Sequence, residues 1–480
     1  MLLSLLLTVP LIGALSLSFK NDSFYTRERI KKEALMFSII TLIISIIIWT
    51  QYNENINDFH SHFLGIHVGL DGMSLYFVLL TTLTLPLAIL SHFKNVVTNV
   101  KLYFTLYLVL EFFLILVFLS RSLISFYSAF EGILIPLYLM MFITEKTVDE
   151  KKLRAANLLF LYTLVGSLFM LLAFIYIIMK VGTGSFIILD YTKLSYDTQF
   201  WVWLALFFSI AIKLPLLPLH NWLTKAHTEA PVGVSMILAG IVLKLAVYLI
   251  MRILIPLLPE ATVFFTPFVQ TLALITLIIG SLITIRQTDV KCLVAYSSIV
   301  HMAVVTLGVF SNDLLGLEGA YILSLAHGLV SPALFYMVGS IIYDYYGTRV
   351  IRYFRGLTTY APILSIFFAF FTFANIATPL SINFIGEFLC LAGTTSNNII
   401  VGFLASSGMV LSAIYGIWIY NRMFFGSVSP YLTAIIDISR RDFHILFVLL
   451  LFTYILGIVP NILLEEIHWS MSNILYYDLN

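Results

Sequence analysis

The sequence has little charge and almost no cysteine for a chain of its length. Only 11% of its 480 residues are Asp, Glu, Lys or Arg, and the two cysteines are Cys292 and Cys390. Two thiolates are too few for an iron–sulfur cluster, which takes about four ligands, and neither a glycine-rich nucleotide loop nor an HExxH zinc motif occurs. These absences predict that the chain itself holds no cofactor and no metal, binds no nucleic acid, and carries out no redox or hydrolytic chemistry.

Hydrophobic residues dominate what remains. They make up 60% of the chain, and the mean hydropathy is +1.01. Apolar runs of about 18 to 25 residues, each able to cross a ~30 Å hydrocarbon core as a helix, recur along the chain. The first run lacks a basic n-region and a cleavage site, so we expect a retained helix there and not a signal peptide. The predicted fold is an all-α polytopic membrane protein with fourteen transmembrane helices near residues 1–19, 34–51, 71–92, 101–119, 122–143, 154–179, 201–219, 232–256, 263–285, 290–310, 317–344, 360–390, 401–425 and 442–462.

The basic residues are divided unequally between the two ends of these helices. Of the 26 Lys and Arg residues, 20 fall in the loops that follow odd-numbered spans and four fall in the other loops. Because loops rich in Lys and Arg stay on the cytoplasmic or matrix side, we expect both termini on the opposite side. The remaining two basic residues, Lys213 and Lys244, lie inside apolar segments.

Other ionisable side chains are also predicted to lie inside the membrane, namely Glu111, Glu131, Glu387, His301 and His327. A charge at the centre of a bilayer costs ~2.5–3.5 kcal/mol on the insertion scale. Two lysines and three glutamates would together cost roughly 12–18 kcal/mol, as much as the whole ~5–15 kcal/mol stability of a typical domain. These groups must therefore be paired or hydrated. They either join the helices as structural ion pairs or carry ions, and a packing role for His327 is a further alternative.

Two of the predicted helices are interrupted by proline. Lys213 precedes Pro215, and Glu387 follows Pro379. Broken helices in corresponding positions of two repeats indicate the ion path of a transporter. We therefore expect four parts: three amino-terminal helices, a first five-helix repeat, a second five-helix repeat, and a last helix with its tail, at residues 1–100, 101–256, 263–425 and 426–480.

Four motifs carry a resemblance to a known family. They are LPLHNWLTKAHTEAPVGVSMILAGIVLK, which begins four residues after Lys213 and ends at Lys244, together with SAFEGILIPLYL, VAYSSIVHM and FIGEF. In these motifs the chain resembles the antiporter-like membrane subunits of proton-pumping NADH:ubiquinone oxidoreductase, respiratory complex I. That family is shared with multisubunit cation/proton antiporters. The resemblance extends over residues 70–425 and implies fourteen helices, two inverted five-helix repeats, and a chain of buried charges along the membrane midplane.

The resemblance also implies roles for single residues. Glu131 corresponds to a fifth-helix glutamate that pairs with the seventh-helix lysine, Lys213. Glu387 corresponds to the last group of the chain, where sibling subunits usually have lysine, so it favours one particular subunit of the family. The order that we expect along the midplane is Lys213, Lys244, His301, His327 and Glu387, with Ser297 and Ser298 on the same helix face as His301.

The implied function is proton translocation in the membrane arm of complex I. NADH oxidation and ubiquinone reduction take place elsewhere in that assembly, with NADH, FMN, iron–sulfur clusters and ubiquinone bound by other subunits. The expected partners are neighbouring antiporter-like subunits and membrane lipid. Richness in Phe, Ile, Leu, Tyr and Asn resembles products of AT-rich organellar genomes, which favours the mitochondrial inner membrane, with the termini in the intermembrane space, over a bacterial inner membrane. A secondary cation/proton antiporter of the Mrp type and an inert polar scaffold remain the alternatives.

Overall fold

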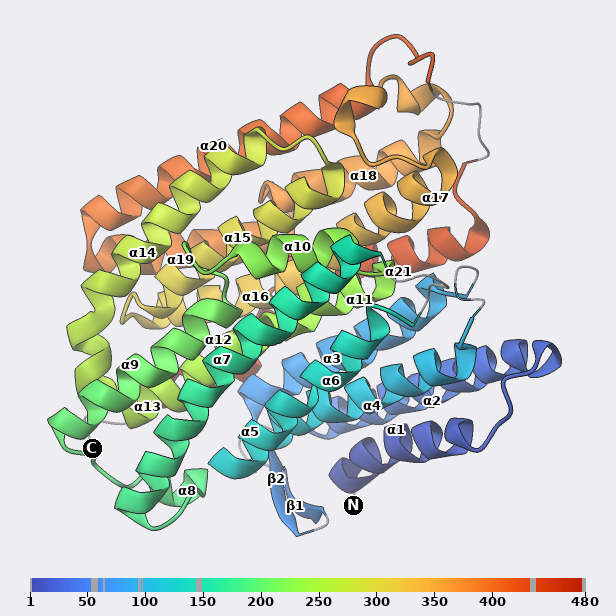
Figure 1. The fold of residues 1–480 in the computed structure, drawn as a ribbon. Helices are drawn as coiled ribbons and strands as arrows, with labels where there is room; N and C mark the ends of the chain where they lie inside the picture. The colour runs from blue at the N-terminus through green and yellow to red at the C-terminus, as the bar shows by residue number, and fades with distance from the viewer. Residues whose placement is uncertain are drawn as a thin grey trace.

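The computed structural model of the chain describes residues 2–52, 59–63, 65–93, 96, 98–143, 149–431 and 437–476. Lys94 and Lys146, two of the basic residues counted in the loops, lie outside these ranges. The described residues form a bundle of long helices that run roughly side by side, with a small β-hairpin at one end (Figure 1). The predicted all-α class is thus correct except for the hairpin.

The first part of the chain contains the hairpin and four long helices. In residues 66–70, IHVGL, apolar side chains stand at every second position as in a strand, and Gly65, at the turn before them, takes a positive φ of 81°. A strand this short is much weaker as a sequence signal than a membrane-spanning run, and it was not predicted. The elements are α1 (Leu2–Ser18), α2 (Phe24–Gln51), β1 (Phe59–Phe63), β2 (Ile66–Leu70), α3 (Gly72–Ser91) and α4 (Val100–Leu119).

The second part contains the first broken helix and a helix that changes its winding. Two short segments, η2 and η3, have the wider π-helical winding and flank α12, which begins at Lys244. The elements are α5 (Leu123–Gly132), α6 (Leu134–Met140), α7 (Glu150–Val181), α8 (Phe186–Leu189), α9 (Tyr196–Lys213), α10 (Asn221–Glu229), α11 (Val232–Ile237), η2 (Leu238–Val242), α12 (Lys244–Leu249), η3 (Ile250–Leu254) and α13 (Ile255–Leu257).

The remaining part contains the second broken helix and a last helix that the sequence did not predict as a span. That last helix, α22, packs on α3 and α16. The elements are α14 (Pro259–Ile285), α15 (Val290–Val309), α16 (Leu314–Tyr336), η4 (Met337–Ile342), α17 (Tyr343–Tyr346), η5 (Ile351–Tyr353), η6 (Leu357–Thr359), α18 (Pro362–Asn375), α19 (Ile382–Asn397), α20 (Ile399–Phe424), α21 (Arg440–Ile458) and α22 (Asn461–Tyr476).

Both helix interruptions occur beside the expected prolines. The first helix, α9, ends at Lys213, two residues before Pro215. The second interruption separates α18 from α19 and contains Pro379. There the backbone has positive φ at two residues that are not glycine, Ala377 at 60° and Leu380 at 77°. Proline cannot donate a backbone hydrogen bond inside a helix, so each interruption frees carbonyl groups within the bundle.

Eleven helical segments of the described chain are long and apolar enough to cross a membrane. The predicted spans near residues 1–19, 201–219 and 360–390 are not among them. Helices α1 and α18 have only 17 and 14 residues, and α9 has Asp197 in its first turn and Lys213 in its last. The structure therefore describes a multi-pass membrane protein with 11 candidate spans.

Burial separates an inner set of helices from an outer set. The most apolar windows of Val232–Leu257 and Leu314–Tyr346 are entirely buried, and that of α15 is 89% buried. By contrast, only 28% of the window is buried in α2 and in α21. The inner helices α11–α13, α15 and α16 therefore form the core, and the polar side chains that they carry are enclosed by protein.

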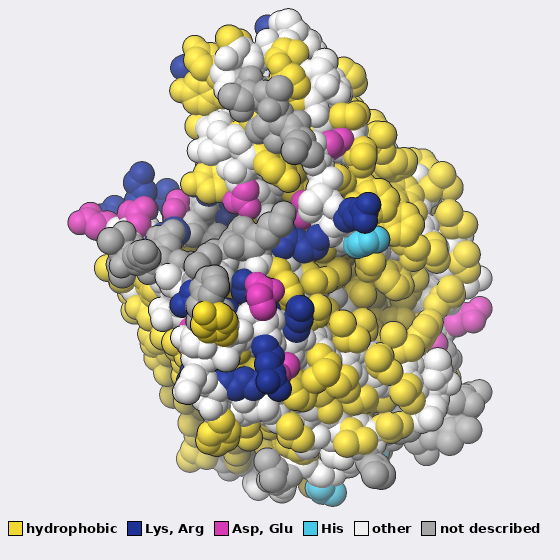
Figure 2. Space-filling view, turned by 90° about the vertical axis from the view of Figure 1, so that its right-hand side faces the viewer, with side chains coloured by type: hydrophobic (Ala, Val, Ile, Leu, Met, Phe, Trp, Pro, Cys, Tyr) yellow, Lys and Arg dark blue, Asp and Glu magenta, His cyan; other side chains and the backbone are white. Residues whose placement is uncertain are grey.

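One face of the bundle carries a group of basic side chains, and we call it the basic face. Figure 2 looks onto the right-hand side of Figure 1, where Lys and Arg side chains gather in the middle of the face with Asp and Glu side chains among them, and hydrophobic side chains cover the flanks. An apolar flank beside a charged end is what a membrane-spanning bundle presents at its aqueous boundary. This distribution agrees with the unequal division of basic residues between the loops.

A buried charge cluster connects the start of α3 with two other parts of the chain. Asp71 caps α3 by accepting a hydrogen bond from the Ser74 backbone N–H at 3.0 Å. Its carboxylate also lies 2.6 Å from Arg252 and 3.7 Å from Arg121. Burial by itself would raise the pKa of Asp71, but Arg252, Arg121 and Ser74 outweigh burial and hold that pKa below its usual range. Asp71 is therefore a helix cap that is also an ion-pair partner.

Asp71→Asn should separate these two roles. Asparagine is as good a helix cap as aspartate, so the variant loses only the negative charge between the two guanidinium groups. Removing one partner of a buried ion pair costs ~3–5 kcal/mol, and we expect a clear fall in the thermal unfolding temperature of the protein in detergent. Ser74→Ala keeps the charges and weakens the cap, so its fall should be smaller. A larger fall for Ser74→Ala would contradict the ion-pair role.

Candidate functional site

Lys213 lies at the first helix interruption with its ammonium group buried. The residue is 2% exposed, and its Nζ lies 4.6 Å above the centre of the Phe130 ring. No hydrogen-bond acceptor within the described residues reaches Nζ. Neighbouring side chains do satisfy the interrupted backbone, because the Trp222 indole N–H donates to the Ile212 carbonyl at 2.8 Å. The unsatisfied group at this interruption is therefore the ammonium itself.

Glu131, the expected partner of Lys213, is near but not in contact. It lies on α5, directly after Phe130, and it acts electrostatically on Lys213. No ion pair joins the two side chains, and Glu131 Oε2 has no hydrogen-bond partner among the described atoms. The buried Ser167 of α7 lies beside the glutamate. The Phe130 ring, and not the Glu131 carboxylate, lies against the ammonium, and the Glu131–Lys213 pair stays a prediction.

Lys244 is completely buried, and two neutral groups hold its ammonium. Its Nζ donates to the Ala239 carbonyl at 2.6 Å and lies 2.7 Å from His327 Nδ1. Ala239 belongs to η2, where the wider π-helical winding places a carbonyl five residues back within reach of the lysine. Such short π-helical segments occur frequently at functional sites. An ammonium donating to His327 Nδ1 requires that nitrogen to carry no proton.

Two glycines bring the lysine and the histidine together. A Cβ atom on Gly328, the residue after His327, would lie 2.9 Å from the Gly240 carbonyl oxygen and 2.5 Å from a Leu80 methyl group. A Cβ atom on Gly240 would meet Pro332 at 3.1 Å. Because neither glycine has a side chain, α16 approaches η2 closely at the height of Lys244.

His301 and Glu387 continue the row of buried side chains that begins with Lys244 and His327. We call these four side chains the file. The His301 and His327 rings are 5.8 Å apart between centroids, and His301 Nδ1 lies 3.0 Å from Glu387 Oε1. That contact is close, but its angles do not make a hydrogen bond, and His301 Nε2 and His327 Nε2 have no partner within the described structure. The buried side chains therefore follow one another as Lys244, His327, His301 and Glu387.

This order corrects the sequence prediction, which placed His301 before His327. The prediction followed the order of the two histidines along the chain. In the structure, α16 packs against both η2 and α19, and α15 packs against α19. His327 on α16 therefore meets Lys244, and His301 on α15 meets Glu387. Sequence position could not have revealed this exchange.

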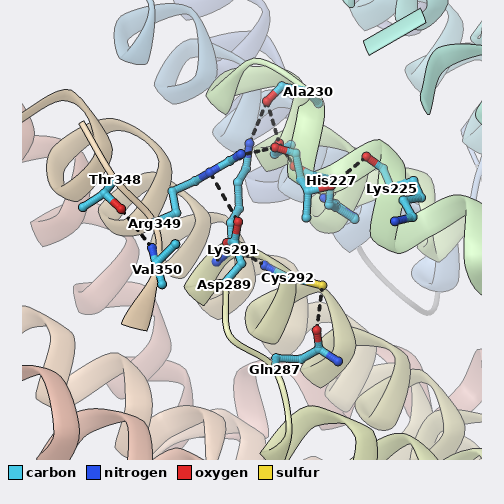
Figure 3. Close-up of polar contacts among 12 residues, drawn as sticks. Lys225, His227, Ala230, Gln287, Asp289, Lys291, Cys292, Thr348, Arg349 and Val350 are labelled. Carbon is cyan, nitrogen blue, oxygen red and sulfur yellow. Dashed lines mark hydrogen bonds and ion pairs between the residues drawn. The ribbon is translucent and has the colours of Figure 1, made fainter. Parts of the chain in front are cut away.

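The sequence analysis also missed a polar cluster near the basic face. Lys291, which it counted among the loop lysines, is only 3% exposed. Its Nζ donates to the Ala230 carbonyl at 2.7 Å, and Arg349 lies beside it at the Asp289 carboxylate, as Figure 3 shows. A hollow of about 440 Å³ opens here, lined by four basic and three acidic side chains together with His92.

His227 connects this cluster with the interior. Its ring stacks on Phe335 at 4.5 Å, and neither ring nitrogen has a partner in the described residues. Burial lowers the pKa of His227 to about 3, and the charges of Lys291 and Lys244 act in the same direction. His227 is therefore neutral near pH 7 and lies within electrostatic reach of both Lys291 and Lys244. Its place in the HNWLTKAHTEAP motif was the only signal in the sequence.

Glu111 is the remaining buried acid, and it lies apart from the file. It is fully buried on α4 and accepts a hydrogen bond from Thr41 of α2.

No group of three or more His, Cys, Asp and Glu side chains within the described ranges is arranged to hold a metal ion. What the assembled file can do chemically is to pass protons between an amine, two imidazoles and a carboxyl group.

Comparisons with known proteins agree on one family. Residues 120–414 match the family described as NADH:quinone oxidoreductase/Mrp antiporter, transmembrane. The chain is 50% identical to NADH-ubiquinone oxidoreductase chain 4 of Mycosarcoma maydis, over 99% of both chains. It is 43% identical to chain 4 of Chondrus crispus, over 97% of this chain and 96% of that one.

Two solved structures have the same fold over almost the whole chain. A chain of respiratory complex I from Thermus thermophilus with bound NADH superposes with a TM-score of 0.88 at 27% identity and covers 99% of both chains. A chain of the Mrp complex from Dietzia sp. superposes with a TM-score of 0.89 at 18% identity, over 99% of this chain and 98% of that one. The second likeness concerns the fold alone.

Gly328→Ala should separate Lys244 from His327. The added methyl group meets a backbone oxygen that cannot move independently, and overpacking of this kind costs ~1–3 kcal/mol. We expect a structure of the variant to show the Nζ–Nδ1 contact lengthened beyond hydrogen-bonding distance and a lower thermal unfolding temperature. Gly240→Ala is the matched control, because its methyl group would lie 3.1 Å from a Pro332 ring carbon and 3.5 Å from the Gly328 carbonyl oxygen, which is an ordinary contact distance. Equal effects of the two substitutions would contradict the proposed close approach.

Proposed function

The chain belongs to the chain 4 family of NADH-ubiquinone oxidoreductase, within the NADH:quinone oxidoreductase/Mrp antiporter transmembrane family, and on this premise we propose that protons cross it along its file of buried side chains. It is a membrane subunit of respiratory complex I and takes part in proton translocation. The roles of single residues are our proposal: Lys213, Lys244, His327, His301 and Glu387 carry the proton, and Glu131 controls the charge of Lys213.

The observation that supports this route is the direct contact between Lys244 and His327. At 2.7 Å, a proton can pass from the ammonium to the imidazole without either heavy atom leaving its place. The Nζ–H bond breaks as the Nδ1–H bond forms, so a cation on the lysine becomes a cation on the histidine. The unpartnered Nε2 atoms of His327 and His301 favour one water molecule between the rings for the next step. Glu387, 3.0 Å from His301, is then the terminal acceptor.

Lys213 is the group from which Lys244 receives its proton. An unpaired ammonium inside a membrane is costly, and at Lys213 an aromatic ring and a nearby carboxylate that does not contact the ammonium offset that cost. Movement of Glu131 toward or away from Lys213 would therefore favour uptake or release of a proton. Glu131 in this scheme controls the charge of Lys213 and does not carry the proton. Water must bridge the gap between Lys213 and Lys244.

The hollow on the basic face provides an aqueous approach to the file. Lys291 lines that hollow, and the buried His227 is within electrostatic reach of both Lys291 and Lys244. By the unequal distribution of basic residues this face is the matrix side, which puts the termini in the intermembrane space. We place the chain in the mitochondrial inner membrane on the composition of its sequence, with fourteen helices once α1, α9 and the pair α18 and α19 are counted as spans.

The architecture that we propose keeps the two five-helix repeats at residues 101–256 and 263–425, preceded by three helices within 1–100 and followed by 426–480. NADH, FMN, iron–sulfur clusters and ubiquinone belong to other subunits of the complex. The hydrophobic flanks (Figure 2) face lipid and neighbouring antiporter-like subunits.

A stand-alone cation/proton antiporter would have the same fold. The assignment to complex I therefore depends on the 50% sequence identity to an NADH-ubiquinone oxidoreductase chain 4.

Lys213 should tolerate neither loss nor permanent retention of its charge. Lys213→Met removes the proton carrier, and Lys213→Arg keeps a cation that does not deprotonate in proteins. We expect both variants to assemble and both to lose NADH-driven proton pumping roughly tenfold or more, measured in reconstituted vesicles. Lys180→Met is the control, because Lys180 also lies over an aromatic ring, Tyr176, but is exposed. Full pumping by the arginine variant would exclude a titrating role.

The role of Glu131 can be tested separately. Glu131→Gln removes the charge that acts on Lys213, whereas Glu131→Asp keeps the charge and moves it back by one methylene group. We expect the glutamine variant to lose most NADH-driven pumping and the aspartate variant to lose clearly less. Wild-type rates in both variants would mean that the electrostatic interaction between Glu131 and Lys213 has no part in translocation.

A further inference from the structure

Asn383 is a buried polar residue that the proposed proton route does not use. It is the second residue of α19, directly after the second helix interruption, and it is fully buried. Neither its amide oxygen nor its amide nitrogen has a hydrogen-bond partner among the described atoms. It does not cap the helix, because Ser381 holds that place and accepts a hydrogen bond from the Phe384 N–H. Buried polar groups in folded proteins are nearly always hydrogen-bonded, so this amide requires an explanation.

Glu387 lies one turn after Asn383, on the same face of α19. The buried residues of that helix include both of them, together with Gly386 and Cys390. In an α-helix, side chains four residues apart are neighbours, and each side chain leans back over the turn that precedes it. The Glu387 carboxyl group therefore extends along the helix toward Asn383.

The two carboxyl oxygens of Glu387 have different surroundings. Oε1 lies 3.0 Å from His301 Nδ1, whereas Oε2 has no partner in the described part of the chain. One oxygen thus faces the file, and the other is available to a second hydrogen-bonding group. The Asn383 amide offers both a donor and an acceptor one helical turn away.

Close packing on two sides fixes the start of α19. A Cβ atom on Gly386 would lie 2.6 Å from the Leu323 backbone nitrogen on α16. A Cβ atom on Gly457 of α21 would lie 2.7 Å from the Ile382 backbone nitrogen, the first of α19. Because α16 and α21 hold the helix between them, α19 cannot rotate to carry Asn383 or Glu387 to another face. The relation between the two side chains is therefore built into the packing.

We propose that Asn383 is a positioning residue for Glu387 and that its amide group hydrogen-bonds Oε2 in both protonation states of the carboxyl group. The inference rests on the proposed proton route. An amide can do this because its NH₂ group donates to a carboxylate, whereas its oxygen accepts from a protonated carboxyl group. A half turn about the last side-chain bond exchanges the two without changing the shape of the side chain. A change of the Asn383 rotamer, or one bridging water, completes the bond. Glu387 can then take up and release a proton while it stays beside His301.

Asn383→Leu tests the amide, because leucine has nearly the same shape and no polar side-chain atom. We expect the variant to assemble and to unfold at the parental temperature or above, since an apolar group replaces an amide without partners. In the complex reconstituted in vesicles, NADH-driven proton pumping should nevertheless fall roughly tenfold, the factor by which one hydrogen bond to a charged group changes an equilibrium. A purely structural Asn383 predicts the opposite, which is parental pumping with any change confined to stability.

Thr394→Val is the matched control on the same buried face, two turns after Glu387. The Thr394 hydroxyl group already donates to the Leu391 carbonyl at 3.0 Å within its own helix, so the variant should pump at the parental rate. Asn383→Gln keeps a donor and an acceptor on a side chain one methylene group longer and should retain most of the pumping. Should Asn383→Leu fail to assemble, Asn383→Met decides in its place, because the flexible methionine side chain adapts to irregular space.

Glu387→Gln, measured in parallel, separates this proposal from the route on which it rests. Loss of pumping in that variant with parental pumping in Asn383→Leu would overturn the role of Asn383 and leave the route intact. Parental pumping in Glu387→Gln would show that the route itself is wrong, and the proposal would fall with it. The double variant should pump no less than Glu387→Gln alone, because Asn383 acts only through the carboxyl group. A further loss in the double variant would exclude the positioning role.

Discussion

The burial of the Lys244 ammonium between a carbonyl and an imidazole is the interaction on which the centre of the molecule depends. A buried cation needs several hydrogen-bond acceptors, and here Ala239 and His327 provide two. The π-helical segment η2 makes the Ala239 carbonyl available, and the close approach of Gly240 and Gly328 brings His327 into range. The π-helical winding, the two glycines and the histidine therefore all contribute to the two hydrogen bonds of the Lys244 ammonium.

The same requirement explains why both interruptions are surrounded by protein. Free carbonyl groups and charges are tolerated at membrane depth only where protein or water satisfies them. At the first interruption, Trp222 and Thr276 bond the freed backbone, and at the second Ser381 caps the restarted helix α19. The outer helices α2 and α21 have regular α-helical winding and expose apolar faces. The bundle thus concentrates its irregular backbone where it concentrates its charge.

The sequence predicted those features that depend on residue type, and it failed on those that depend on packing. Lys213, Lys244 and Glu387 were recognisable because a charge in an apolar run is conspicuous, and both interruptions followed from proline chemistry. The order of His301 and His327 was wrong because it is set by which helix packs on η2. Lys291 was taken for a loop lysine since it lies only two residues after Asp289, and its burial depends on Ala230 from another segment.

The two ends of the file also constrain its charge. Lys244 and Glu387 are separated by two imidazoles in an interior where charges interact much more strongly than in water. A cationic Lys244 together with an anionic Glu387 leaves the file neutral, and so does a neutral lysine with a protonated glutamate. These two states differ by the movement of one proton through His327 and His301, and neither leaves a net charge in the interior. A further proton entering the file makes it a net cation, which the low dielectric of the interior opposes. On the proposed route, release at Glu387 therefore accompanies loading at Lys244, and a carboxyl group at that end permits this coupling because its charged form offsets the lysine.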